Sequence, residues 1–363
     1  MAGKISFATQ LAPVAEKGVS DTGLYHEAIA DARLAQRLGY SAGWVLEHHF
    51  SDYYPTPNPL MLLSYVAAAC PGFGLGTAVM VLPWYNPVRF AEDIAALQVM
   101  SGADLHIGLG RGNAPLEYEA FDVAMSEARA RFKESWDIVR TGLKGKPFSY
   151  KGEFLNVRRD ITIRPLLEDK KPNFYGAITS TASAGIMADQ GLPPLVFLNF
   201  PDELLYEILT AWKKRSKELG LSTEVTLPVL TLCYIADTNE EARQEAKKFL
   251  PEHFRLQYEH YEVHRNAWST IPGYEETTKM FLNFKKMLNI ENIEGLLDQN
   301  LIGTPEHITK RIETVAKMGF NHFIIRNGTP TVTREARHRM LTRFANEIAP
   351  HFGHQVPNNT VAA

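Results

Sequence analysis

The sequence predicts an α/β fold built from eight strand–helix units in one domain over residues 1–363. Short apolar runs alternate with segments of helical period from one end of the chain to the other. Such alternation implies parallel strands joined by helical crossovers. No break in composition and no linker divides the sequence into two domains. Eight units form either a closed (β/α)8 TIM barrel or a large doubly wound sheet, and single α/β barrels with insertions often reach this length.

The strand candidates are short and apolar, and segments with the period of a helix separate them. They are Ile5–Thr9, Ala42–Glu47, Gly74–Met80, Leu105–Gly110, Asn173–Ile178, Leu195–Asn199, Pro228–Ile235 and Phe320–Arg326. In the first helix, apolar residues from Leu24 to Leu38 fall on one stripe, and Gly39 is placed to end the helix. Three later helices begin with an N-cap residue followed by proline. These starts are Asn58-Pro59, Asn86-Pro87 and Thr304-Pro305.

Two segments exceed the simple repeat and are predicted to be insertions after the fourth and seventh strands. Gly145–Asp160 has the character of a hairpin that follows the fourth helix. The longer segment runs from about His260 to Leu301 and contains the aromatic residues Trp268, Tyr274, Phe281 and Phe284. A connection of this length near a barrel mouth is either a lid or a helical insertion that packs on the barrel wall. The polar tail Gln355–Ala363 is predicted to fray.

The composition is that of an ordinary soluble globular protein: 45% of the residues are hydrophobic and 22% are charged. Lys and Arg number 38 against 41 Asp and Glu, so the net charge is −3, and no long basic run occurs. This disfavours a nucleic acid or an anionic membrane as partner. No stretch approaches the roughly 18 apolar residues of a membrane span, and no apolar signal segment precedes the first strand. Cys70 and Cys233 have no disulfide or metal spacing, so we expect a reducing, cytoplasmic location.

The strongest local feature is Glu47-His48-His49, which closes the second strand. Charged and imidazole groups are unexpected for packing there, but in a barrel this position faces the active-site mouth. A hydrogen-bonded histidine pair that stabilises the strand end is an equally good interpretation. No metal site is predicted, because no third ligand lies at a helpful spacing. His260, Glu262 and His264 resemble a metal cluster only superficially, and we expect a solvated helix face there.

Three further strand ends carry residues suited to a ligand. Arg111 follows the fourth strand between glycines, where the backbone can approach a ligand and the guanidinium can reach a phosphate. The glycine spacing differs from the dinucleotide fingerprint, so a Rossmann site is rejected. Thr179–Ser183 begins a helix after the fifth strand, and it offers either an anion site or a simple N-cap. The small residues in Gly76–Met80, at the end of the third strand, leave room for a flat ligand. Together these ends favour a planar ligand that bears a phosphate.

At these residues the sequence resembles the bacterial luciferase-like monooxygenases, over nearly the whole chain and in the right order. The matching segments are Trp44–Phe50, Asn58-Pro59, Gly76–Val79, Val81–Pro83, Pro87–Arg89, Gly108–Gly112, and Ser180–Ser183 with Gly191–Pro193. The resemblance implies a TIM barrel that binds FMN at the carboxyl ends of its strands. It implies that a non-proline cis peptide, Ala78–Val79, lies against the flavin ring.

The resemblance also implies roles for single residues. The FMN phosphate would be held by Arg111, by Arg129 on the fourth helix, and by the Thr179–Ser183 run through Thr179, Ser180 and Ser183. His48 matches the histidine on which luciferase activity depends, as a base near the flavin C4a adduct. The carboxylate of Glu47, which is adjacent in the sequence, would orient that imidazole or favour its protonated form. His49 is expected to point the opposite way and to serve stability.

The function implied is that of a two-component FMN-dependent monooxygenase. Reduced FMN would come from a separate flavin reductase and react with O2, and a flavin C4a-(hydro)peroxide would oxygenate a small organic substrate. The family implies a homodimer that buries the second and third helices, Pro59–Cys70 and Pro87–Ser101. An F420-dependent oxidoreductase and a non-catalytic flavin-binding protein are the alternatives, and His48 argues against the second. Gly110 stands where luciferase carries a reactive cysteine, so light emission is not predicted.

Overall fold

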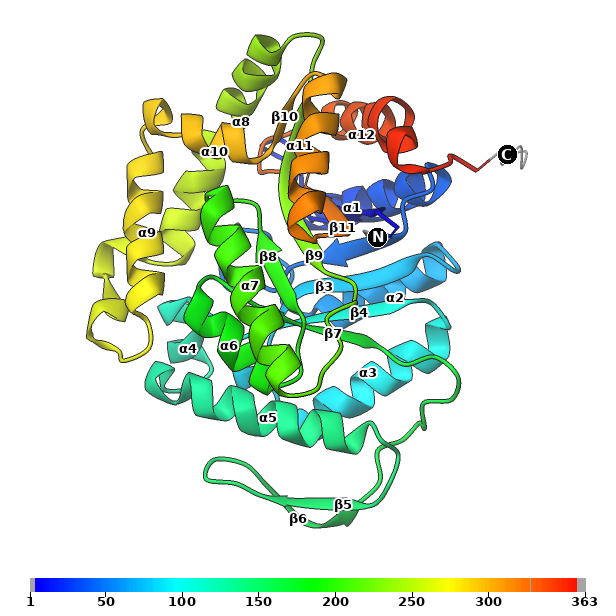
Figure 1. Ribbon diagram of the computed structural model, residues 1–363, viewed down its shortest axis with the longest axis vertical. Coiled ribbons are helices and arrows are strands. Elements are labelled where there is room, and N and C mark those ends of the chain that lie inside the picture. The colour runs from blue at the N-terminus through cyan, green and yellow to red at the C-terminus, as the bar shows by residue number, and fades with distance from the viewer. Residues whose placement is uncertain (1–3, 327, 358–363) are drawn as a thin grey trace.

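Eight parallel strands close into a barrel in the computed structural model, which describes residues 4–326 and 328–357. The strands are β1 (Ser6–Gln10), β2 (Ala42–Val45), β3 (Gly74–Val81), β4 (Leu105–Gly110), β7 (Asn173–Ala177), β8 (Pro194–Phe197), β9 (Pro228–Ile235) and β11 (His322–Arg326). Neighbours pair in parallel around the ring, and the pairing of β8 with β9 closes it (Figure 1). The closed barrel is therefore confirmed over the doubly wound sheet. Each predicted strand is found with its ends within two residues of the expected positions.

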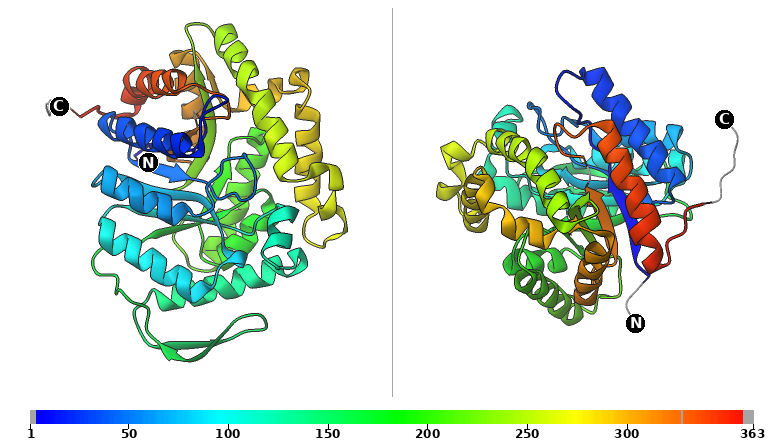
Figure 2. Two further views of the ribbon diagram at one scale, coloured as in Figure 1. Left: turned by 180° about the vertical axis from the view of Figure 1, so that it is seen from behind. Right: turned by 90° about the horizontal axis from the view of Figure 1, so that it is seen from above.

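Helices surround the barrel on its outer side. They are α1 (Asp21–Arg37), α2 (Pro59–Ala69), α3 (Pro87–Ser101), α5 (Ala128–Gly142), α6 (Thr181–Asp189), α7 (Asp202–Glu218), α8 (Asn239–His260), α11 (Pro305–Met318) and α12 (Arg334–Arg343). The three predicted starts are confirmed, because Asn58, Asn86 and Thr304 each accept a hydrogen bond from a backbone N–H of the first turn. Helices α1 and α12, from opposite ends of the chain, lie side by side (Figure 2).

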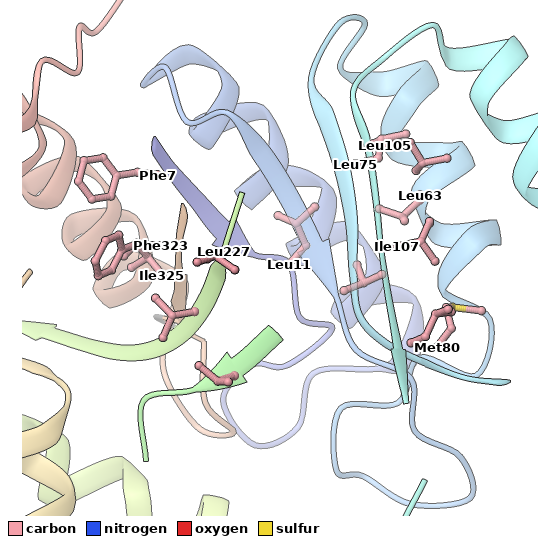
Figure 3. Packing of buried hydrophobic residues seen from close by; sticks show 14 of the residues in the cluster. Phe7, Leu11, Leu63, Leu75, Met80, Leu105, Ile107, Leu227, Phe323 and Ile325 are labelled. Carbon is pink, nitrogen blue, oxygen red and sulfur yellow. The ribbon is translucent and has the colours of Figure 1, made fainter. Parts of the chain in front are cut away.

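The core has one layer outside the barrel and one inside it. Outside, side chains such as Leu75 and Ile107 project from the strands toward the surrounding helices (Figure 3). Inside, the indole of Trp44 is fully buried and stacks on His106, with 5.4 Å between ring centroids. A Cβ added at Gly76 would lie 2.3 Å from this indole. The room predicted at Gly76 is therefore filled by the protein's own tryptophan rather than by a ligand.

Both predicted insertions are present. The hairpin of β5 (Phe148–Lys151) and β6 (Asn156–Ile161) is antiparallel and projects from the lower edge of the molecule (Figure 1). After β9, the long α8 leads to α9 (Glu275–Met287) and α10 (Glu294–Gln299), which form one flank of the barrel. A strand that the sequence did not reveal, β10 (Leu301–Gly303), then pairs with the last residues of β9.

The remaining expectations concern the chain ends and membranes. Of the tail predicted to fray, residues 358–363 lie outside the described residues. Within the described residues, no helix is both long enough and apolar enough to cross a bilayer.

Candidate active site

A cavity of about 910 Å³ lies at the carboxyl ends of the barrel strands. This is the end at which TIM-barrel enzymes place their active sites. Eight of the nine residues predicted for the site are in its wall: Glu47, His48, Ala78, Val79, Arg111, Arg129, Thr179 and Ser183. The ninth, Ser180, is not in the wall. The cavity size is that of pockets that hold a cofactor or drug-sized ligand.

His48 lies in the cavity wall just beyond the end of β2, which stops at Val45. Its imidazole packs edge-on against the imidazole of His260, with 4.7 Å between ring centroids, and against Tyr53. His260 is the last residue of α8 and is only 1% exposed. The expectation that His260 belongs to a solvated face is therefore wrong, because the 22 residues of α8 carry it back over the barrel mouth.

Glu117 completes a buried cluster with these two histidines, which we call the His48–Glu117–His260 cluster. It lies on the short helix α4 (Pro115–Ala120), which follows the β4 end. Its Oε1 accepts a hydrogen bond of 2.7 Å from the backbone N–H of His49 and lies 3.4 Å from Nε2 of His260. The hydroxyl of Ser51 lies 2.7 Å from the other ring nitrogen of His260. The sequence reasoning missed Glu117, because nothing near it in the sequence indicates this contact.

Burial sets the protonation of the cluster. Desolvation first, and then the charges of His260 and His49, holds the pKa of His48 well below 6.5. Burial also lowers the pKa of His260 to about 3. Desolvation raises the pKa of Glu117 to about 8, although the bond from the His49 backbone opposes the shift. At neutral pH the cluster therefore combines neutral imidazoles with a protonated carboxyl group.

Glu47 does not orient His48, which corrects the predicted role of this carboxylate. Its Oε1 accepts from the hydroxyl of Tyr85 at 2.9 Å and lies 3.1 Å from Nε2 of His49. Its Oε2 accepts from the backbone N–H of Val81 at 2.8 Å. Glu47 thus ties the end of β2 to the end of β3, and its partner is His49. The local reason is that the strand pleat ends at Val45, so alternation no longer sets the side-chain directions.

The His48–Glu117–His260 cluster is also the one group among the described residues with metal-ligand geometry. One ligand atom from each residue lies within 4.8 Å of the others. The third ligand that the sequence lacked near His48 is thus supplied by distant segments. The raised pKa of Glu117 means that its carboxyl group keeps a proton at neutral pH. Binding of a divalent cation here would require release of that proton, because metal ligands must be deprotonated.

Arg111 and Arg129 converge on one acceptor atom. The Nη1 of Arg111 donates to the carbonyl oxygen of Gly273 at 3.0 Å, and the Nη2 of Arg129 donates to the same oxygen at 3.4 Å. The guanidinium of Arg111 also stacks on the ring of Tyr274, 3.9 Å from its centroid. Gly273 and Tyr274 belong to the insertion after β9. The insertion therefore reaches across the cavity to the predicted phosphate-binding arginines.

The predicted anion site at α6 is also an N-cap. The hydroxyl of Ser180 accepts from the backbone N–H of Ser183 at 3.2 Å, and the hydroxyl of Ser183 accepts from the N–H of Ser180 at 3.0 Å. This reciprocal capping box starts the helix. Only Thr179 and Ser183 of this run reach the cavity wall.

The floor of the cavity is made by Ala78 and Val79. The peptide bond between them is cis, as predicted. Gly110, at the end of β4, is a close neighbour of Val79, because a Cβ added at Gly110 would lie 2.4 Å from the Val79 side chain. The contact explains why no larger residue stands at position 110.

A second residue that sequence reasoning missed is Arg326, the last residue of β11. It is 4% exposed and lines the cavity. The signal was present, because a charged residue that ends an apolar parallel strand is the same pattern that singled out His48 after β2. Tyr53 lies in the wall as well, whereas Trp44, Tyr54, Trp84 and Tyr85 do not.

Comparison with known proteins points to one family for most of the chain. The family model described as luciferase-like monooxygenase matches residues 7–322. An uncharacterized protein, y4vJ of Sinorhizobium fredii, is 34% identical, but the match covers only 47% of each chain. The oxygenase component of the flavin-dependent trigonelline monooxygenase of Acinetobacter baylyi is 23% identical over 91% of this chain and 90% of that protein.

Solved structures share the fold at lower identity. Monooxygenase RslO1 from Streptomyces bottropensis has a TM-score of 0.81 at 22% identity, covering 96% of this chain and 100% of that one. The oxygenating constituent of 3,6-diketocamphane monooxygenase from Pseudomonas putida, in complex with FMN, has a TM-score of 0.76 at 18% identity. The match covers 96% of this chain and 99% of that one. An F420-dependent secondary alcohol dehydrogenase has a TM-score of 0.73 at 16% identity, covering 95% and 98%. The fold alone is therefore compatible with either cofactor.

Proposed function

The chain belongs to the luciferase-like monooxygenase family, and from this premise we propose that it is the oxygenase component of a two-component FMN-dependent monooxygenase. It would take reduced FMN from a separate flavin reductase and use O2 to oxygenate a small organic substrate. The trigonelline monooxygenase relative is itself named an oxygenase component, which supports a separate reductase.

The observation that carries the proposal is that two arginines of the cavity wall converge on one acceptor atom. Arg111 and Arg129 both donate to the carbonyl oxygen of Gly273. Guanidinium groups suit phosphate oxygens because they present several N–H donors in a fixed plane. Thr179 and Ser183, at the start of α6, lie in the same wall; the hydroxyl of Thr179 adds a donor, and the hydroxyl of Ser183, which here donates to the carbonyl oxygen of Ser180, can turn to a ligand. This donor set fits the phosphate of FMN.

The remaining wall residues fit the flavin ring and the chemistry. When bound, reduced FMN would supply the electrons with which O2 gives one oxygen atom to the substrate and one to water. Ala78 and Val79 add apolar surface to the same cavity wall as the arginines. His48 is neutral and can accept a proton from a reacting group, while the protonated Glu117 holds a proton nearby. Of these two residues, His48 would thus accept a proton and Glu117 would hold one.

Two measurements test the proposal. The purified protein is titrated with FMN and with F420, and binding is followed by the absorbance of each cofactor. Reduced FMN is then supplied by an unrelated flavin reductase, and O2 consumption and product are measured with aldehydes, ketones, terpenoids and trigonelline. We expect tighter binding of FMN and oxygenated product from at least one compound. Tighter binding of F420 with hydride transfer would favour the F420-dependent alternative, and FMN binding without any product would favour a non-catalytic protein.

A further inference from the structure

Arg326 places a positive charge in the cavity on the side opposite to the predicted phosphate site. It ends β11, and the strand order β11-β1-β2-β3-β4 puts this strand half-way around the eight-stranded barrel from β4, which carries Arg111. The side chain is almost fully buried but lies in the cavity wall. Arg326 and Arg111 therefore face one ligand space from two ends.

The partners of Arg326 are neutral. Its Nε and Nη2 donate to the hydroxyl of Tyr54 at 3.1 and 2.5 Å, and that hydroxyl donates to the carbonyl oxygen of Gly328. Its Nη2 lies 3.3 Å from both ring nitrogens of His253. Burial, and then the charge of Arg326 itself, keeps the pKa of His253 well below 6.5, so this imidazole is neutral. Burial likewise raises the pKa of Tyr54, which stays a neutral phenol.

No carboxylate of the described residues forms an ion pair with Arg326. The other buried arginine differs sharply: Arg337 is 2.9 Å from Asp31 and 2.7 Å from Glu27. A buried charge without a counter-charge costs several kcal/mol, and removing such a charge often stabilises a protein. The fold does not require Arg326 as a cation, so a role in binding is the better explanation.

A second polar group in the same wall has an unused hydrogen-bond acceptor. The Oε1 of Gln257, on α8, is buried and has no hydrogen-bond partner among the described residues, and Gln257 lines the cavity. An amide side chain offers two donors as well as an acceptor, and its two ends are interchangeable by a simple rotation. The cavity wall around Arg326 thus holds a cation without a counter-charge and an amide whose oxygen has no hydrogen-bond partner, while the Gln257 side chain is hydrogen-bonded to Tyr53.

From these contacts we propose that Arg326 is the recognition residue for a carboxylate group on the substrate, with Gln257 as a second donor. The inference rests on the proposed function, because it assigns the substrate class of the same site: small organic acids. A carboxylate matches the guanidinium fork and would supply the missing negative charge inside the cavity. The positive charge of Arg326 is one of the factors that lower the pKa of His48. Substrate binding would therefore raise the basicity of His48 at the moment when a base is needed.

The test is a set of calorimetric titrations on the full-length protein, with and without FMN. The probes are matched pairs of acid and neutral amide, namely benzoate with benzamide and hexanoate with hexanamide. We expect at least one acid to bind the wild type more tightly than its amide, by about 10–150-fold, the range for a charge-assisted bond. Arg326→Met should abolish this preference and leave FMN affinity within a few-fold. Arg33→Gln, which removes an exposed cation from α1, is the control and should keep the preference.

Thermal melting provides the second readout. Arg326→Met replaces a buried cation without a counter-charge by a shorter, unbranched apolar side chain, so its melting temperature should be equal to or higher than that of the wild type. Arg337→Met, which removes the arginine partner of the buried Asp31 and the partly buried Glu27, should melt at a much lower temperature.

Several outcomes would overturn the proposal. They are equal binding of acid and amide by the wild type, no binding of any acid, a preference that survives Arg326→Met, and a loss of stability in Arg326→Met as large as that in Arg337→Met. A loss of FMN affinity in Arg326→Met would instead make Arg326 a phosphate ligand of the cofactor. Failure of the proposed function is separate, since it appears as absent FMN binding or absent product in the wild type.

Discussion

His48 is a neutral imidazole in the cavity wall, and this charge state determines how it can act. Because its pKa is held well below 6.5, it is available as a base over the whole neutral range. We predict that His48→Ala keeps FMN affinity within a few-fold but lowers turnover by about 10²–10⁴, the usual contribution of a positioned acid–base group. The measurement is product formed per reduced FMN, with released hydrogen peroxide measured in parallel.

His49 is the matched control for His48, because it is adjacent but faces Glu47 and Trp84 instead of the cavity. His49→Ala removes a buried partner of Glu47, so it should lower stability by about 1–3 kcal/mol while the folded fraction still forms product. Full activity in His48→Ala together with an inactive but folded His49→Ala would reverse the two assignments.

Arg111 is predicted to hold the cofactor phosphate. Arg111→Ala should weaken FMN binding by about 1.5–3 kcal/mol, or roughly 10–150-fold, because a charge-assisted contact is lost. Arg140→Ala is a suitable control, since Arg140 is an exposed residue of α5 that pairs with Asp137. Fluorescence quenching of FMN gives the dissociation constants. Equal affinities in the wild type and Arg111→Ala would place the phosphate elsewhere.

Part of this site was predictable from the sequence and part was not. His48, Arg111 and Ser183 follow strands whose apolar runs are plain, and the carboxyl ends of parallel strands meet at one mouth. Glu117 and His260 come from segments 68 and 209 residues away from their contacts His49 and Ser51. Their positions depend on the length of α8 and on the short helix α4, which no local pattern specifies. The same limitation explains why Glu47 was assigned to His48 when it contacts His49.

At the scale of an element, the packing of β3 on β4 shapes the cavity floor. Gly110 on β4 has space for no side chain, because a Cβ there would lie 2.4 Å from the Val79 side chain. We predict that Gly110→Ala lowers stability by about 1–3 kcal/mol through overpacking and strain and also weakens FMN binding, because Val79 must move. Chemical unfolding and FMN titration measure the two effects.

Gly185→Ala is the matched control for Gly110→Ala. Gly185 lies in the middle of α6, and nothing lies within 4 Å of a Cβ added there. Alanine is favoured over glycine in a helix interior, so this variant should be as stable as the wild type or slightly more stable. If Gly110→Ala behaved in the same way, the strands would be more adaptable than their contact distances indicate.

At the scale of the whole molecule, α2 and α3 leave an apolar face uncovered. Met61 and Tyr65 on α2 and Val99 and Met100 on α3 are between 48% and 72% exposed. Such a patch favours a protein–protein contact, and we propose that it forms the homodimer interface that the family resemblance implies. We predict a dimer in light-scattering measurements and a shift toward monomer in Met61→Lys/Met100→Lys. A monomeric wild type, or an unchanged dimer in this variant, would contradict the use of this face. Substitutions at the exposed Leu219 and Leu221, beyond α7, serve as the control.

The stability of the whole barrel should depend on pH with a sign set by its buried histidines. Burial lowers the pKa of His106 to about 4 and that of His322 to about 3, inside the barrel, and His260 likewise to about 3. The unfolded chain takes up protons at these residues below about pH 6.5, whereas the folded chain does so only near pH 3–4. The unfolded state therefore binds more protons in this window, and the free energy of unfolding rises with pH up to about 6.5.

Glu117 acts in the opposite direction and gives the test an internal check. Its pKa of about 8 in the folded state exceeds the ordinary 4.5, so the folded state binds more protons between these values and loses stability as the pH rises. Each group contributes at most about 1.4 kcal/mol per pH unit, so the three histidines outweigh Glu117 below pH 6.5, and Glu117 dominates between 6.5 and 8.

Urea unfolding should therefore give maximal stability near pH 6.5, a steep loss toward pH 4.5 and a shallow decline toward pH 8. Glu117→Gln should remove the shallow decline and make the rise between pH 4.5 and 6.5 steeper, because glutamine has no ionisable carboxyl group to oppose the histidines. An acid limb that is flat down to pH 4.5 would mean that the buried histidines gain access to water in the folded protein.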